Sequence, residues 1–311
     1  MHRVTRLDRA QMTVPERFAR HSGGFRRQPL VDGTAGSVHM GFAACELEAG
    51  GHIEPHVQSY EEAVYVLDGE LELTMNGERI RLGKDEGGLI PVGVLHAWRN
   101  PGTQLSTWVE MVAPRPRGDR DPADIFFQPQ APATGTARRV DARDPRCRQF
   151  FHFEPGQMDL DSARRGSRVD APVVSPSMLT ALLVYSGIGI KMLVDQRQDA
   201  NLFTMFMVEY EPGGVAHPHD HPLEEAYLIL DGEVDAVADG QTYRLQAGDC
   251  FWTGVGTIHA FYNRSAQKVR WLETQAPQPP RNHSYRFNRE WEYLGQLLAA
   301  GRASAGGASQ Q

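Results

Sequence analysis

The sequence predicts an all-β protein made of two tandem β-barrels or sandwiches. Three observations carry this prediction: an internal repeat, short apolar runs separated by tight-turn pairs, and a length of 311 residues, which suits one large domain or two ordinary ones. Hydrophobic residues make up 41% of the chain and charged residues 23%, so each copy can bury a core, and a disordered or fibrous chain is excluded.

The repeat is visible as a constant spacing between matching residues. The segment from His56 to Asn100 aligns without insertion on the segment from His219 to Asn263, so every pair is separated by 219 − 56 = 163 positions. The alignment continues outward to the pair Pro114 and Pro277. Identical residues at this spacing include His56/His219, Glu62/Glu225, Gly69/Gly232, Gly77/Gly240, Arg81/Arg244, Gly93/Gly256, His96/His259 and Asn100/Asn263.

Each copy shows the pattern of short strands joined by hairpins. Residues 63–73 and 226–237 are rich in Val, Leu, Ile and Tyr, as strands are, and both are interrupted by turn pairs. Asp-Gly and Asn-Gly favour two-residue hairpin turns, so we expect strands of roughly five to eight residues. The turn pairs are Asp68-Gly69 and Asn76-Gly77 in the first copy, and Asp231-Gly232 and Asp239-Gly240 in the second.

The repeat also sets the expected domain boundaries. We expect an N-terminal barrel over residues 1–118, a connector over 119–170, a C-terminal barrel with the metal site over 171–295 and a disordered tail over 296–311. The connector is rich in Pro, Arg and Asp, and its apolar run 125–127 is expected to anchor it. A short C-terminal helix is expected from four apolar residues at helical spacing, namely Phe287, Trp291, Leu294 and Leu298.

Composition restricts the partners and the compartment. The net charge of −7 is the wrong sign for binding nucleic acid or an anionic membrane surface. The sequence has no apolar run long enough to span a bilayer and no secretory leader, and its three cysteines show no paired spacing. We therefore expect a cytoplasmic protein that acts on a small-molecule substrate, with no nucleic acid or membrane partner, and that could form a homodimer.

Four residues of the second copy form a candidate metal site. His219 and His221 are two apart, so on a strand both side chains leave the same face, and Glu225 shares that parity if the strand is unbroken. His259 follows after two hairpin signals, at a separation that lets an antiparallel strand return beside the first. Three imidazoles and one carboxylate suit Fe(II), Mn(II), Ni(II), Co(II) or Zn(II), with open positions for substrate, water or dioxygen.

The spacing of these residues resembles both motifs of the cupin superfamily. The pattern runs from Gly213 through His219, His221 and Glu225 to Gly232, then from Gly248 through Gly256 and His259 to Asn263, with Gly254 where that family usually has proline. Since the resemblance extends over both copies, the chain looks like a bicupin of the metal-dependent type. The resemblance implies two double-stranded, jelly-roll-like β-barrels with the metal held inside the mouth. Many cupins with this ligand set are dioxygenases.

The first copy departs from this pattern at one ligand position. Its equivalents are His56, Gln58, Glu62 and His96, with glutamine in place of the second histidine. A glutamine carbonyl is a neutral and weaker oxygen ligand, so affinity for a first-row metal should fall. Two hypotheses remain open: a weak or differently tuned second metal site, or a vestigial barrel kept for packing.

Residues around the second site are further candidates. Glu225 is expected to act as both ligand and proton acceptor, while His217 and Tyr227 are candidate catalytic residues, as a proton shuttle and a substrate contact. Tyr227 and Ile229 should line the barrel interior, whereas Leu228 and Leu230 should pack against another layer. Trp252, Phe261 and Tyr262 are candidates for an aromatic wall around the metal, and Trp98, Trp108 and Trp271 are expected to serve the core.

The favoured function is a metal-dependent oxidoreductase, a non-haem dioxygenase with Fe(II) or Mn(II), acting on a small oxygenated organic substrate; Ni, Co or Zn are possible metals. A second hypothesis is a redox-neutral Mn or Zn bicupin, such as a hydrolase resembling ureidoglycine aminohydrolase, a decarboxylase or an isomerase. A third is a bicupin that binds small molecules without catalysis. The chain lacks the motifs of serine hydrolases, nucleoside triphosphatases and dinucleotide-binding enzymes.

Overall fold

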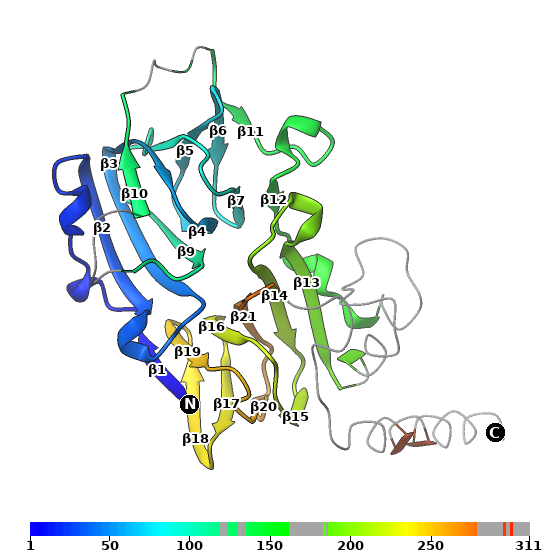
Figure 1. Cartoon of the computed structure of the whole chain (residues 1–311). Coiled ribbons are helices and arrows are strands. Elements are labelled where there is room, and N and C mark those ends of the chain that lie inside the picture. Colours follow the sequence, from blue (N-terminus) through cyan, green and yellow to red (C-terminus); the bar gives the residue numbers. More distant parts are fainter. Residues whose placement is uncertain are drawn as a thin grey trace.

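The computed structural model of the protein describes residues 1–117, 124–129, 133, 135–161, 183–184, 186–278, 295–296 and 299–300. Within this part of the chain, strands dominate and are joined by short turns and 3-10 helices (Figure 1). The first half contains β1 His2–Arg6, β2 Ser22–Val31, β3 Gly41–Gln58, β4 Glu61–Asp68, β5 Leu71–Met75, β6 Glu78–Leu82, β7 Glu86–Ile90, β8 His96–Arg99 and β9 Ser106–Ala113. The connector contains β10 Ile125–Phe127, β11 Arg138–Arg139 and β12 Phe150–His152.

The second half repeats the strand order of the first. It contains β13 Ile188–Val194, β14 Thr204–Tyr210, β15 Val215–His219, β16 Glu224–Asp231, β17 Glu233–Ala238, β18 Gln241–Gln246, β19 Asp249–Thr253, β20 His259–Tyr262 and β21 Val269–Ala276. The expected Asn-Gly and Asp-Gly turns are present, since Asn76 and Asp239 both adopt positive φ angles, 52° and 49°. The predicted all-β fold with curled sheets is confirmed.

Equivalent strands pair in both halves, and these pairings set the position of the candidate ligands. In the second half β15 and β20 are antiparallel, with His219 directly opposite His259. In the first half the long strand β3 pairs with β8 in the same way, with His56 opposite His96. Both ladders have an irregular register just before the histidine, and this irregularity alters the alternation of side chains there.

The two halves exchange strands. The N-terminal strand β1 pairs antiparallel with β19 of the second barrel, from His2 opposite Thr253 to Arg6 opposite Asp249. Conversely, β12 of the connector pairs with β7 of the first barrel. Figure 1 shows β1, in dark blue, lying against the yellow strands of the second barrel. The second barrel is therefore extended by a strand that precedes the first barrel in the sequence. The first barrel is extended by a strand that lies between the two barrels.

The core has three parts, one inside each barrel and one between them. Tyr227 and Ile229 belong to the cluster inside the second barrel, while Leu228 belongs to a large cluster formed by both halves and Leu230 packs against that cluster. The predicted alternation along β16 is thus confirmed. The predicted core role of the three tryptophans is also confirmed: Trp98 and Trp108 lie in the first barrel's cluster and Trp271 in the second.

Two buried carboxylates join the barrels at equivalent positions. Glu61 accepts hydrogen bonds from the backbone N–H groups of Asn201 (2.9 Å) and Leu202 (2.8 Å) in the second half. Glu224, its partner in the repeat, accepts one from the backbone N–H of Val38 (2.8 Å) in the first half. Both glutamates are 2% exposed, so these bonds lie in the dry interface between the barrels.

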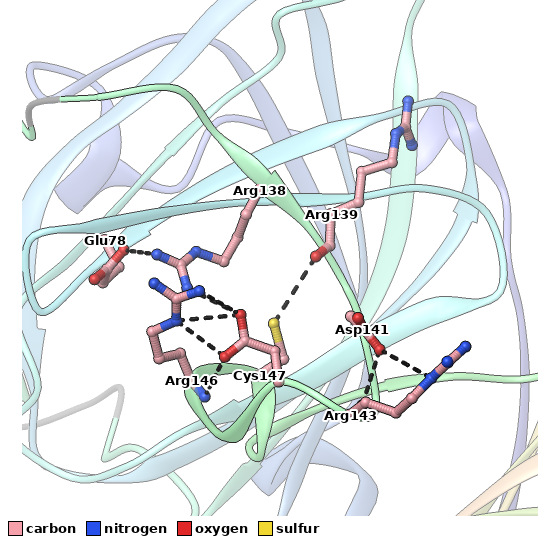
Figure 2. Close-up of polar contacts among 8 residues, drawn as sticks. Glu78, Arg138, Arg139, Asp141, Arg143, Arg146 and Cys147 are labelled. Carbon is pink, nitrogen blue, oxygen red and sulfur yellow. Dashed lines mark hydrogen bonds and ion pairs between the residues drawn. The ribbon is translucent and has the colours of Figure 1, made fainter.

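The connector lies along the first barrel. As expected, residues 125–127 anchor it, because β10 pairs with β3 from Gln58 to His56. Further along, Arg138 contacts Glu78 of β6 (2.6 Å) and Asp144 (3.3 Å) in a cluster of charged residues (Figure 2). Exposed ion pairs of this kind contribute little to stability, so the backbone pairing is the firmer attachment.

Several expectations lie at the edge of the described chain. The four residues that predict the C-terminal helix, 287, 291, 294 and 298, lie outside the described residues, as do most of the tail and parts of the connector. All three cysteines, Cys45, Cys147 and Cys250, are buried and free. In the described part of the chain, no helix has the length and apolar character needed to cross a bilayer.

Candidate metal centre

Three histidines of the second barrel converge inside it. His219 ends β15, His259 begins β20 directly opposite, and His221 lies in the short link to β16. One ring nitrogen of each lies within 4.8 Å of the others. All three are at most 6% exposed. Within the described residues this is the one group of three or more potential ligand atoms at such a spacing.

Backbone carbonyl groups fix the orientation of two of these rings. The Nδ1 atom of His219 lies 2.6 Å from the carbonyl oxygen of His217, and that of His259 lies 2.9 Å from the carbonyl oxygen of Thr257. A carbonyl can only accept, so Nδ1 carries the hydrogen and Nε2 presents a lone pair. Metal-binding histidines are commonly held in this way.

Glu225 brings a carboxylate to the same group. Its Oε2 atom lies 3.4 Å from His221 Nε2 and 3.3 Å from His259 Nε2. The hydroxyl of Tyr227 donates to Oε2, and the Gln275 amide donates to Oε1 at 2.6 Å. The strand pairing places Gln275 opposite Glu225. Glu225 is therefore held from both sides with one oxygen facing the imidazoles.

Burial dominates the electrostatics of the centre. Desolvation, reinforced by a neighbouring imidazole, lowers the pKa of His219 and of His259 to about 3, so both rings are neutral. Burial also raises the pKa of Glu225, and it raises that of Glu273 well above its usual range, with the Glu225 carboxylate as a further cause. Neutral imidazoles beside a buried carboxyl group are the donor set that a divalent transition metal ion requires.

The space beside the histidines is small. A cavity of about 30 Å³ is lined by His219, His221 and Tyr227, among others. Since a water molecule needs roughly 10–15 Å³ by this kind of measure, the cavity has room for about two waters beside the cluster. The Tyr227 hydroxyl lies 2.9 Å from His259 Nε2, which places the phenol at the centre of the group.

The other candidates of the second copy lie in different places. His217 is half-buried and its ring packs edge-on against Tyr262, while its carbonyl group holds His219. The irregular register between Ala216 and His219 accounts for the separation of the His217 ring from the cluster. Residues 217 and 219 would point to the same side only in a regular strand. Phe261 lies beside His259, with ring centroids 5.8 Å apart, whereas Trp252 packs in the interface between the barrels.

The equivalent residues of the first barrel form two pairs, one of histidines and one of Gln58 with Glu62. The rings of His56 and His96 are 4.1 Å apart, and their Nδ1 atoms contact the carbonyl groups of Glu54 (2.8 Å) and Val94 (2.9 Å), as in the second barrel. The two remaining predicted ligands contact each other instead.

The Gln58 amide donates to Glu62 Oε2 at 2.9 Å. Burial, with the charge of Glu110, raises the pKa of Glu62 to about 8, and burial lowers that of His96 to about 3. The first barrel therefore keeps the two oriented imidazoles, but its carboxyl group is engaged by the amide that replaces the second histidine.

Sequence reasoning missed two neighbours of Glu225 and two glutamates of the interface between the barrels. Gln275 and Glu273 adjoin Glu225 through the pairing of β16 with β21, a register that spacing alone could not fix. Glu61 and Glu224 were passed over as well, although their identity at the spacing of the repeat was a usable signal. Identical buried acidic residues at equivalent positions of a duplicated sequence indicate that both copies make the same kind of contact.

Comparisons with known proteins agree with this architecture. A family model described as a cupin domain matches residues 43–112 and 206–274. Among curated proteins, the polyketide synthase CurC of Streptomyces cyaneus is 34% identical over 96 residues, covering 30% of this chain and 62% of that protein. The transcriptional regulator PuuR of Escherichia coli is 29% identical over 92 residues, covering 29% and 49%.

A third relative matches over a longer stretch of the chain. Quercetin 2,3-dioxygenase of Bacillus subtilis is 24% identical over 216 residues, covering 64% of this chain and 62% of that protein. The matches thus span between about half and 62% of the lengths of these relatives.

Solved structures show the same fold at low identity. Salicylate 1,2-dioxygenase from Pseudaminobacter salicylatoxidans has a TM-score of 0.62 at 12% identity, covering 80% of this chain and 76% of that one. Oxalate decarboxylase from Lactobacillus farciminis also has a TM-score of 0.62, at 14% identity, covering 93% and 89%. One fold thus carries both oxidative and decarboxylating enzymes.

Proposed function

The chain is a bicupin of the cupin superfamily, and from that premise we propose that its second barrel is a metal-dependent oxidoreductase centre. The proposed reaction is a dioxygenation of a small oxygenated organic substrate. The observation that carries the proposal is the buried group of His219, His221 and His259, whose ring nitrogens lie within 4.8 Å, with the Glu225 carboxylate in contact.

These four residues would hold Fe(II) or Mn(II), with Ni, Co or Zn as other ions that the same donors accept. A redox-active ion held there supplies the electron chemistry that reaction with dioxygen requires. The match to quercetin 2,3-dioxygenase, which covers 64% of this chain, supports the oxidative assignment.

The protein's own residues have separate tasks in this proposal. The carbonyl groups of residues 217 and 257 hold the imidazoles so that Nε2 faces the centre. Glu225 is a ligand and a proton acceptor, and the Tyr227 hydroxyl orients it by donating a hydrogen bond to its Oε2 atom. The walls exclude bulk water, because Tyr227 and Phe261 are each 2% exposed. His217, next to Tyr262, serves as a proton shuttle at the outer side.

A redox-neutral reaction is the alternative, and the carboxyl group of Glu273 favours it. Glu273 lines the cavity beside Tyr227 and is 6% exposed. A pair of buried carboxyl groups, Glu225 and Glu273, can hold and transfer protons in a hydrolase, decarboxylase or isomerase without electron transfer. Binding of a small molecule without catalysis would use the same donors.

Metal analysis followed by an oxygen-electrode screen tests the proposal. Natively purified protein is analysed for bound metal, then assayed for oxygen consumption with small phenols, diketones and hydroxy acids. One ion per chain, lost in His219→Ala and His259→Ala together with oxygen uptake, is the expected result. His56→Ala is the matched control, because it removes the equivalent imidazole of the first barrel.

Each outcome separates the hypotheses. Turnover of a substrate without oxygen uptake would replace the dioxygenase by the redox-neutral enzyme. Wild-type protein that retains far less than one ion per chain after reconstitution would end the metalloenzyme proposal.

A further inference from the structure

The interior of the first barrel contains a cavity of about 140 Å³, against about 30 Å³ beside the histidines of the second. Most of its lining comes from β2, β3, β4, β8 and β9, and the rest from neighbouring segments that include Phe18 and Ile125. An engineered apolar cavity of roughly 150 Å³ binds benzene, so this space admits a small organic molecule.

One wall of the cavity is aromatic. The ring centroid of Trp108 lies 5.8 Å from that of Phe25 and 6.0 Å from that of Trp98, and both pairs are stacked. All three side chains line the cavity and are at most 3% exposed. Ile53 adds an aliphatic contact from β3. The apolar part of a ligand can pack against this wall.

Polar side chains line the same cavity and lie close to one another. Arg27 Nε contacts Glu110 Oε1 at 2.6 Å, and the Gln58 amide donates to Glu62. Burial raises the pKa of Tyr60 well above its usual range, the charges of Glu62 and Glu110 raise it further, and that of Arg27 opposes them. The Tyr60 hydroxyl is therefore within electrostatic reach of both ion-pair partners.

Several atoms of these side chains have no hydrogen-bond partner among the described residues. The donors are the two terminal nitrogens of Arg27, which contacts Glu110 only through Nε, and the hydroxyl of Tyr60. The acceptors are Gln58 Oε1 and His56 Nε2, whose ring is oriented through Nδ1. The cavity thus presents both donors and acceptors to a ligand.

Two of these polar residues replace apolar residues of the second copy. Arg27 aligns with Ile190, and the two hold equivalent register positions in their strands. Tyr60 aligns with Leu223. Burying polar groups whose hydrogen bonds are incomplete lowers stability, so a barrel kept only for packing would be more stable with isoleucine and leucine there. The polar residues therefore indicate a ligand that completes their hydrogen bonds.

The charges in the cavity favour an uncharged ligand. Arg27 and Glu110 form an ion pair at 2.6 Å, so each already has its counter-ion. A ligand with a net charge would bring a second charge out of water, and the desolvation of that charge is costly unless a partner is free. A neutral group that both accepts and donates hydrogen bonds meets the unpaired atoms without this cost.

We propose that the first barrel binds a small, uncharged carboxamide. Its carbonyl oxygen accepts from the terminal nitrogens of Arg27 and from the Tyr60 hydroxyl, and its N–H groups donate to His56 Nε2 and Gln58 Oε1. Its apolar part packs against the aromatic wall. The site is independent of the metal centre proposed for the second barrel, and it takes the place of a second metal site in the first.

Titration of the full-length protein with isobutyramide, followed by saturation-transfer NMR, tests the inference. Isobutyramide has as many non-hydrogen atoms as benzene, and three compounds of the same shape are matched ligands: 3-methylbutan-2-one lacks the N–H groups, isobutyrate is an anion and isobutyramidine is a cation. We expect isobutyramide to bind with a millimolar dissociation constant, roughly tenfold or more tightly than each of the others. The ketone leaves buried acceptors unpaired, and the two ions bring an unmatched charge.

Two variants locate the ligand in the cavity. Ile53→Phe fills space beside the aromatic wall and should reduce isobutyramide affinity at least tenfold. Tyr60→Phe keeps the ring but removes one donor, so it should reduce the affinity roughly 3–10-fold. Tyr60→Phe decides the question if Ile53→Phe does not fold, as judged by circular dichroism. His259→Ala, which disables the metal centre of the second barrel, should leave the affinity unchanged.

Four results would overturn the inference. The first is no binding of isobutyramide to wild-type protein at tens of millimolar. The second is a ketone, carboxylate or amidinium that binds as tightly as the amide. The third is isobutyramide binding that survives both cavity variants or disappears in His259→Ala. The fourth is a second metal ion per chain that is lost in His56→Ala, because the site would then serve a metal.

Discussion

Replacing Glu61 by alanine is expected to destabilise the protein by about 3–5 kcal/mol, because the residue joins the two barrels. The carboxylate is 2% exposed and accepts hydrogen bonds from the backbone N–H groups of Asn201 and Leu202 in the other barrel. Each bond to a charged acceptor contributes about 1.5–3 kcal/mol, and both N–H groups would remain buried without a partner. Glu61→Gln keeps one acceptor oxygen and should cost about half as much.

Urea unfolding followed by tryptophan fluorescence and far-ultraviolet circular dichroism measures this loss. Glu233→Ala is the control, because Glu233 forms an ion pair with Arg244 at 3.4 Å but is 44% exposed, and such pairs are worth about 0–1 kcal/mol. A Glu61→Ala midpoint no lower than that of Glu233→Ala would refute the view that these buried carboxylates join the barrels. Separate transitions for the two barrels in the variant alone would support it further.

The remaining predictions concern the two sites and one close contact. Gln275→Ala should lower metal affinity about 10–100-fold, measured by competition with a chelator, because it frees Glu225 Oε1; unchanged affinity would contradict the assigned orientation. Gln58→His should raise total bound metal, measured by elemental analysis, if the first site is geometrically intact, and unchanged stoichiometry would favour the vestigial barrel. Gly88→Ala should destabilise the fold by about 1–3 kcal/mol in thermal unfolding, since its Cβ would lie 2.4 Å from Phe150 Cδ1. An unaltered melting temperature would show that β12 shifts to accommodate the added methyl group at little cost.

Much of the fold could be predicted because each sequence pattern that indicates a strand, a turn or a ligand occurs twice, once in each copy. The constant spacing of the histidines and of the Asp-Gly turns indicates two copies of one all-β unit, and period-two alternation correctly separates Tyr227 from Leu228. The convergence of His219 on His259 follows from the same hairpin spacing.

The rest depends on contacts that are distant in sequence. The position of the His217 side chain follows from a local irregularity in strand register, and no residue pattern predicts that irregularity. Gln275 reaches Glu225 only through the pairing of β16 with β21. Sequence spacing predicts the order of strands along the chain but not which strands pair side by side in a sheet.

The exchange of β1 and β12 has a consequence for how the chain reaches its native state. β1 begins at His2, yet its partner strand β19 lies some 250 positions later, so β1 cannot pair until most of the second barrel has been synthesised. Pairings this distant in sequence slow folding, because a long loop must close before they form. During translation β1 thus stays without its partner strand, and completion of the sheet in the second barrel depends on a strand synthesised some 250 residues earlier.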